Sequence, residues 1–143
     1  MKWFEIPENL IPKLRELQKQ NLSYPIVKSE DAVVMYIGMG GEMYLTFDGR
    51  VITVDWMDGY QPNEAKTLSE AAMALVLGAE RSNLPELLSL LPSRPPEAED
   101  CLNCKQTGWL NLGSETLTFI CGDCGGLGWK VQETGDVTVF GQN

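Results

Sequence analysis

One stretch of this 143-residue sequence decides the fold: Glu42-Met-Tyr-Leu-Thr-Phe-Asp-Gly-Arg-Val-Ile-Thr-Val-Asp-Trp56. Met43, Leu45 and Phe47 fall on one face of the first half, and apolar and polar residues alternate through the second half. An Asp-Gly pair between two such runs is a strong signal for a two-residue hairpin turn. The stretch therefore predicts two antiparallel strands, Glu42–Phe47 and Arg50–Trp56.

A third strand is predicted just upstream. Ala32–Ile37 is an apolar run rich in β-branched and aromatic residues, which favour strands. The glycine-rich Gly38–Gly41 follows it and lacks the Lys-Ser/Thr of a phosphate-binding loop, so we interpret it as a hairpin turn. Three consecutive antiparallel strands result.

Helices are predicted on both sides of these strands. Pro7–Asn21 has leucine and isoleucine at helical spacing and predicts an amphipathic helix. Thr67-Leu-Ser-Glu70 has the form of a capping box, so a helix should run from there to about Arg81. Asn83 is expected to cap a shorter helix that ends near Leu91. This order of elements predicts an α+β domain over residues 1–92, with an antiparallel sheet flanked by helices.

A second unit is predicted after a stiff, proline-rich linker over residues 93–100. Residues 101–143 contain all four cysteines, Cys101, Cys104, Cys121 and Cys124, in a C-x2-C-x16-C-x2-C arrangement. This spacing is typical of a four-cysteine zinc site. We expect one structural Zn²⁺ per chain, because four thiolates close the tetrahedron and leave no position for water.

Two other interpretations of the cysteines stay open at this point. A Cys-x-x-Cys pair also occurs in redox proteins, although no βαβ context surrounds these pairs. Two disulfides would suit a secreted protein, but the N-terminus lacks the apolar run of a signal peptide. We therefore expect a cytoplasmic protein with reduced thiols.

The zinc module is expected to contain two β-hairpins. Trp109–Leu112 should pair with Thr116–Ile120, and Trp129–Gln132 with Val137–Phe140. Each cysteine pair is followed by a glycine and a tryptophan at the same offset, so the module reads as a two-fold repeat. The tryptophans Trp109 and Trp129 are expected to shield the metal thiolates.

This repeat is similar to half of the cysteine-rich domain of DnaJ-type co-chaperones, whose unit is C-x-x-C-x-G-x-G. Residues 121–128 fit the unit fully, whereas the first copy has Gln106 where the pattern has glycine. The resemblance covers about twenty-eight residues and implies zinc ligation by the four cysteines. It does not extend to the His-Pro-Asp signature of those co-chaperones, because the chain has no histidine.

The first ninety residues or so resemble the later part of the SUKH superfamily. The resemblance lies in Tyr44-Leu-Thr-Phe-Asp-Gly-Arg-Val-Ile-Thr-Val-Asp-Trp56 and in the helix start Thr67-Leu-Ser-Glu-Ala71. It implies an antiparallel sheet flanked by helices. It also implies a role for this chain as a bacterial immunity protein that binds and silences a toxin.

Charge and composition narrow the function further. Residues 32–100 contain eleven acidic and four basic side chains, and the whole chain has a net charge of −9. An acidic protein is a poor partner for phosphate backbones, so we expect no nucleic-acid binding. No apolar stretch is long enough to span a membrane. The absence of histidine excludes a Ser-His-Asp triad and any histidine-ligated metal.

Two residue groups each have two interpretations. Asp55, Asp58 and Glu64 fail the EF-hand spacing, so a solvated loop is preferred to a cation site. Trp3 and Phe4 either dock on the sheet or belong to a partner interface.

The leading hypothesis is a non-catalytic zinc protein that binds a basic protein partner, such as a toxin. The alternative is a chaperone-like or adaptor module that presents zinc-stabilised hairpins to clients, and a cation-dependent hydrolase comes third. Neither the partner nor the oligomeric state follows from the sequence.

Overall fold

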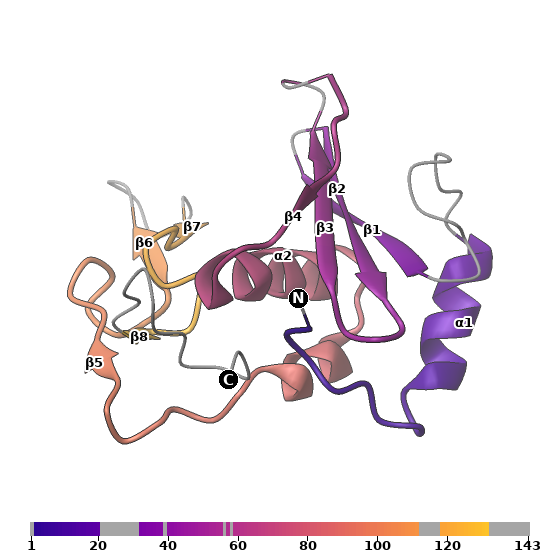
Figure 1. The fold of residues 1–143 in the computed structure, drawn as a ribbon. Coiled ribbons are helices and arrows are strands. Elements are labelled where there is room, and N and C mark those ends of the chain that lie inside the picture. Colours follow the sequence, from indigo (N-terminus) through magenta and orange to yellow (C-terminus); the bar gives the residue numbers. More distant parts are fainter. Residues whose placement is uncertain are drawn as a thin grey trace.

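The α+β fold is confirmed by a computed structural model, which describes residues 2–20, 32–38, 40–55, 57, 59–111 and 118–131. The elements that build the larger part are α1 (Ile11–Gln20), β1 (Ala32–Gly38), β2 (Gly41–Thr46), β3 (Val51–Asp55), β4 (Asn63–Glu64), α2 (Leu68–Arg81) and the 3-10 helix η2 (Pro85–Leu90). Strands β1 to β4 form one antiparallel sheet in chain order. In Figure 1 the sheet stands on α2, with α1 beside β1 and η2 on the opposite side of α2.

Both predicted hairpins of the sheet are present, but the turn at Asp48-Gly49 is longer than the two residues predicted. The N–H of Thr46 donates to Arg50 O, so Thr46 and Arg50 close the turn and Phe47 lies in it rather than in β2. Leu45 pairs with Val51 across the turn at Asp48-Gly49, and Gly38 pairs with Gly41 at the other turn. Strand β3 ends at Asp55, and Trp56 lies outside the described residues. The two-residue strand β4 was not predicted, because Asn63-Glu64 has no apolar pattern and its pairing with β3 depends on the fold.

The main core lies between the sheet and the helices. Its fully buried members include Leu14 from α1, Val33 and Met35 from β1, Met43 and Leu45 from β2, Leu75 from α2 and Leu87 from η2. A second buried cluster, with Val34, Tyr44 and Val54, occupies the opposite face of the sheet. The sheet is thus apolar on both faces, which explains why β1 reads as a continuous apolar run rather than an alternating one.

The N-terminal aromatics dock on the domain. The backbone N–H groups of Trp3 and Phe4 both donate to the carbonyl of Gly49, and Trp3 Nε1 donates to the carbonyl of Ala65. Phe4 is only 2% exposed and belongs to the core. Of the two interpretations of these residues, docking on the sheet is therefore the correct one.

Helix α2 matches its prediction closely. Thr67 is the N-cap, and its hydroxyl accepts a hydrogen bond from the backbone N–H of Glu70. The Glu70 carboxylate reaches back to the N–H of Lys66 rather than to that of Thr67. The cap therefore satisfies one of the free amide groups of the helix, and the second bond of the predicted capping box is replaced by a bond to the residue before the cap.

The segment after α2 differs from its prediction. Asn83 does not cap the start of a helix but lies at the end of α2, where it adopts a left-handed φ of 52°. The N–H of Asn83 donates to Glu80 O, and the N–H of Leu84 donates to Ala79 O. Asparagine tolerates this conformation better than most residues, which suits it to a helix C-terminus. The following helix is a 3-10 helix, Pro85–Leu90, with Leu84 at its N-cap position.

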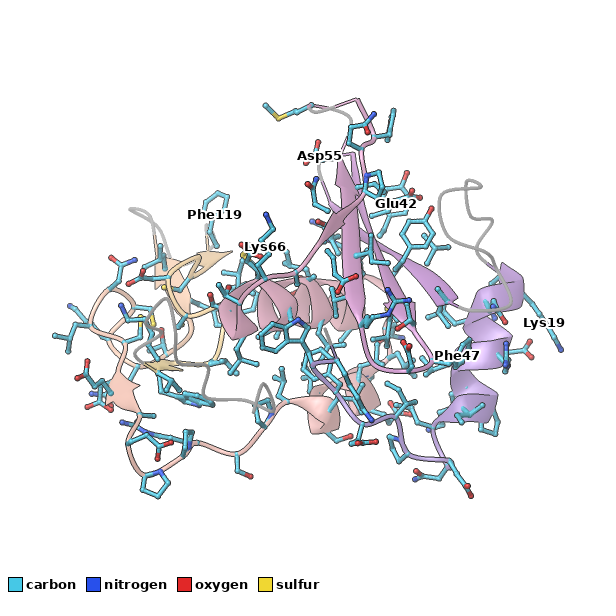
Figure 2. The ribbon with its side chains drawn as sticks, viewed as in Figure 1. Lys19, Glu42, Phe47, Asp55, Lys66 and Phe119 are labelled. Atoms are coloured by element: carbon cyan, nitrogen blue, oxygen red, sulfur yellow. The ribbon has the colours of Figure 1, made fainter. Side chains whose placement is uncertain are left out.

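The first helix is also shorter than predicted. Residues Glu8 to Leu10 form a turn, and α1 begins at Ile11, just before Pro12, which can occupy the first turn of a helix. Arg15 lies over the ring of Phe47, with its guanidinium carbon 4.0 Å from the ring centre. Phe47 lies beside α1 (Figure 2), so this contact joins α1 to the turn between β2 and β3.

Candidate metal centre

The cysteine-rich segment forms two small hairpin-like units beside the N-terminal end of α2 (Figure 1). We call residues 101–109 the first knuckle and residues 121–129 the second knuckle. Strands β6 (Trp109–Asn111) and β7 (Thr118–Ile120) pair as predicted, and the turn between them lies outside the described residues.

The second predicted hairpin stays a prediction, but its first strand has a partner that the sequence did not indicate. Strand β8 (Trp129–Lys130) pairs with β5 (Glu99–Asp100), which the sequence places in the linker. The expected partner segment, Val137–Phe140, lies outside the described residues. Pairing between residues so far apart leaves no local pattern, so the sequence could not indicate it.

The two knuckles share one backbone conformation. Lys105, Gln106 and Gly108 have φ values of 54°, 70° and 84°, and their counterparts Gly125, Gly126 and Gly128 have 67°, 90° and 84°. Gln106, the departure from the repeated pattern, thus adopts the left-handed conformation that glycine adopts in the second knuckle. The repeat seen in the sequence is therefore a repeat in structure.

Reciprocal backbone bonds join the two knuckles. The N–H of Cys101 donates to Gly128 O at 3.0 Å, and the N–H of Cys121 donates to Gly108 O at 2.9 Å. A Cβ on Gly128 would lie 2.6 Å from Gln106 O, so this position needs glycine for close approach as well as for its φ.

The four sulfur atoms converge on one point. All four Sγ atoms lie within 4.8 Å of one another, with 3.8 Å between Cys101 and Cys121 and 3.7 Å between Cys104 and Cys124. Four thiolates around a tetrahedral ion at about 2.3 Å would be separated by about 3.8 Å. Both distances are far longer than the S–S bond of a disulfide, about 2.05 Å, and all four cysteines are free. The residues therefore fit a tetrahedral metal ion.

The cluster is closed and hydrogen-bonded. The cysteines are 0–4% exposed, and Leu110 packs against them. The N–H groups of Gly108 and Gly128 donate to Cys104 Sγ and Cys124 Sγ, each at 3.2 Å, in equivalent places. Such donors hold sulfur ligands in orientation and stabilise their negative charge.

The thiol pKa values follow from burial and these donors. Burial raises the pKa of Cys101 and raises that of Cys124 to about 12. Burial acts in the same direction on Cys121, but hydrogen bonds, first those from the backbone of Cys124 and Asp123, outweigh it and lower its pKa to about 7. Four thiolates this close need a cation, because a coordinated metal removes the thiol protons and offsets the repulsion between the sulfurs.

The predicted tryptophan shield is only partly right. Trp129 is 8% exposed, but the apolar residue packed against the cysteines is Leu110, which the sequence analysis did not single out. The feature of the sequence that could have indicated Leu110 is its position next to Trp109, at the start of a predicted strand. Trp129 instead borders a cavity of about 200 Å³ that also reaches Leu68 and Ser69 of α2.

The second knuckle contacts α2 directly. A Cβ placed on Gly125 would lie 2.9 Å from the carbonyl carbon of Ser69 and closer still to its oxygen. A Cβ on Gly126 would lie 3.5 Å from Val76 Cγ2. The metal module is therefore in contact with the α+β domain at the start of α2.

Asp55 and Glu64, the described members of the acidic group, each have another partner and do not form a second cluster. Asp55 Oδ1 accepts from the N–H of Met57 at 2.9 Å, and Glu64 Oε1 pairs with Arg50 Nη1 at 3.2 Å, while Asp58 lies outside the described residues. Within the described ranges, the four cysteines are the group of three or more cysteine or carboxylate ligands that could hold one ion. The same ranges hold no helix with the length and apolar character needed to cross a bilayer.

Comparisons with known proteins do not place this chain in a family. No family model, no curated protein and no solved structure matches it.

Proposed function

We propose that this chain is a non-catalytic zinc protein that binds a basic protein partner in the cytoplasm. The observation that carries the proposal is the closed set of four buried thiols at tetrahedral spacing. Zinc is the ion that suits four sulfur ligands in this geometry, and a four-thiolate site has a structural role. The metal then supports a small module, and the function belongs to the protein surface.

The charge of the protein supports the choice of partner. Eleven acids against four bases in residues 32–100 produce a negative field. Such a field accelerates the approach of a basic surface. The resemblance to the SUKH superfamily implies that the partner is a toxin, which would make this chain an immunity protein.

Metal content tests the first half of the proposal. Elemental analysis of protein purified without added metal should find one zinc per chain. It should find markedly less in a Cys121→Ser/Cys124→Ser variant. Wild-type protein that is folded, has four free thiols and takes up no zinc on titration would contradict the proposal.

Salt dependence tests the second half. The wild type and an Asp55→Lys/Asp58→Lys variant would each be used to capture proteins from the native host, and association rates would be measured for the partner recovered. The variant should bind more slowly and with a flatter dependence on ionic strength, because steering by exposed charge is screened by salt. Equal rates and equal salt slopes would remove the acidic surface from the mechanism.

One observation favours the second candidate, a chaperone-like or adaptor module. Leu102 in the first knuckle is 80% exposed, and Phe119 on β7 is 50% exposed and labelled in Figure 2, so the metal module presents apolar side chains to solvent. Binding of unfolded clients through these residues would strengthen, not weaken, as salt is added. A Leu102→Ser/Phe119→Ser variant that lost binding would favour this candidate over the first.

A further inference from the structure

A groove lies between α2 and the β3–β4 edge of the sheet. Its volume is about 360 Å³, and Ile37, Val54, Ala65, Met73, Ala74 and Leu77 supply its apolar lining. This size falls at the lower end of the range for ligand sites, about 300–1,000 Å³, and has room for a few side chains.

Two side chains of α2 line this groove instead of joining the core. Met73 and Leu77 are four residues apart and so lie on one face of the helix, and both are partly exposed. The buried core cluster takes Ala71, Ala74 and Leu75 from the same helix. Partly exposed methionine and leucine beside a groove are typical of adaptable binding surfaces.

Charge surrounds this apolar lining. The carboxylates Asp55, Glu64 and Glu70 border the groove, against one base, Lys66. In Figure 2, Asp55 lies at the far end of the sheet and Lys66 lies near the start of α2. Glu64 is already paired with Arg50, whereas Asp55 and Glu70 each accept a hydrogen bond from a backbone N–H, that of Met57 and that of Lys66 respectively, which fixes their positions. A carboxylate can accept about four hydrogen bonds, so each has capacity for a further donor.

We propose that this groove binds a segment of a partner protein in which apolar side chains alternate with lysine or arginine. The apolar side chains would pack against Met73 and Leu77, and the basic ones would pair with Asp55 and Glu70. The inference rests on the proposed function and assigns its binding face. The metal module contacts the same helix at Ser69 and Val76, neither of which lines the groove.

The test uses a phage-displayed library of short random peptides, selected on the full-length, zinc-loaded protein at low salt. The selected peptides should be enriched in lysine or arginine next to apolar residues. Synthetic copies should bind a Met73→Lys/Leu77→Lys variant at least about ten-fold more weakly than the wild type. Leu88→Lys is the matched control, since Leu88 is a leucine on η2 that is 43% exposed and does not line the groove.

A second variant keeps the test valid if the lysine substitutions prevent folding. Met73→Ala/Leu77→Ala removes the apolar contacts with residues that favour helix, and it should also weaken the peptides relative to the control. Zinc content and circular dichroism would establish that each variant is folded. Selected peptides that bind the groove variants and the wild type equally would contradict the groove as the binding site. Peptides without an excess of basic residues would overturn the charge requirement.

The outcomes separate this inference from the proposed function. Suppose that a native partner binds the groove variants as tightly as the wild type, yet still binds Asp55→Lys/Asp58→Lys more slowly. That result would contradict the groove as the binding face, and the proposed function, an acidic protein that binds a basic partner, would still stand.

Discussion

Replacing Gly125 by alanine tests whether the second knuckle is fastened to α2. Gly125 has a φ of 67°, and an added Cβ would lie 2.9 Å from the carbonyl carbon and 3.0 Å from the Cα of Ser69. Both neighbours are backbone atoms, so neither can swing aside. The knuckle would have to move by roughly 1 Å, and close-packed interfaces tolerate such shifts poorly.

Two terms contribute to the expected loss of stability. A left-handed φ costs alanine about 1 kcal/mol more than glycine. Overpacking against fixed atoms adds about 1–3 kcal/mol. The sum, about 2–4 kcal/mol, is a large share of the total stability of an ordinary domain, about 5–15 kcal/mol.

Two other glycines separate these terms. Gly59 has a φ of 74° and nothing within 4 Å of an added Cβ. Gly59→Ala should therefore lose only the stability that the left-handed conformation costs alanine. Gly122, in the same knuckle as Gly125, also has open space and a φ outside the left-handed region. Gly122→Ala should therefore change stability by less than about 0.5 kcal/mol.

Two assays report the result. Urea unfolding of the zinc-loaded proteins gives the stability differences, and hydrogen exchange of residues 66–73 reports opening of the first turn of α2. We expect faster exchange there in Gly125→Ala alone. If Gly125→Ala and Gly122→Ala match in both stability and exchange, the contact between knuckle and helix is not a stabilising one and the reasoning is wrong.

Three further predictions concern the metal, the helix cap and pH. Cys104→Ser should reduce zinc content and disorder the metal module, while the α+β core stays protected from hydrogen exchange, because that core contains no module residue. Protection lost throughout the protein would show one shared folding unit. Thr67→Ala should cost about 1 kcal/mol in urea unfolding and Thr67→Ser much less, since the cap bond from Glu70 N–H is lost only in the first. Equal losses would contradict a role for the hydroxyl. Burial raises the pKa of Glu42 above 4.5, so the folded state favours its protonated form and loses stability as pH rises through that pKa. Glu42→Gln should therefore gain on the wild type between about pH 4 and pH 7, and a constant difference across that range would exclude the effect.

Local signals in the sequence predicted most of the elements. The Asp48-Gly49 turn and the Thr67-Glu70 cap are short-range features whose chemistry is complete within a few residues. The cysteine pairs belong to the same class, because each pair brings two ligands to one turn. Their convergence into one cluster followed from metal-site spacing and is confirmed in the geometry.

Features that depend on distant contacts escaped prediction. Strand β4, the pairing of β5 with β8, and the contact of Gly125 with Ser69 each join segments whose own sequences carry no matching pattern. Asn83 was misread for a related reason. Asparagine favours both helix starts and helix ends, and only the path of the chain decides between them.

The pairing of β5 with β8 also has a consequence for how the gene can be edited. Asp100 lies opposite Trp129, so the chain enters and leaves the metal module at neighbouring points, about 5 Å apart as in any antiparallel pair. A tight turn spans that gap. The module therefore begins and ends at one place, so we expect a foreign loop whose ends lie equally close to join Asp100 to Trp129 without changing the path of the chain on either side.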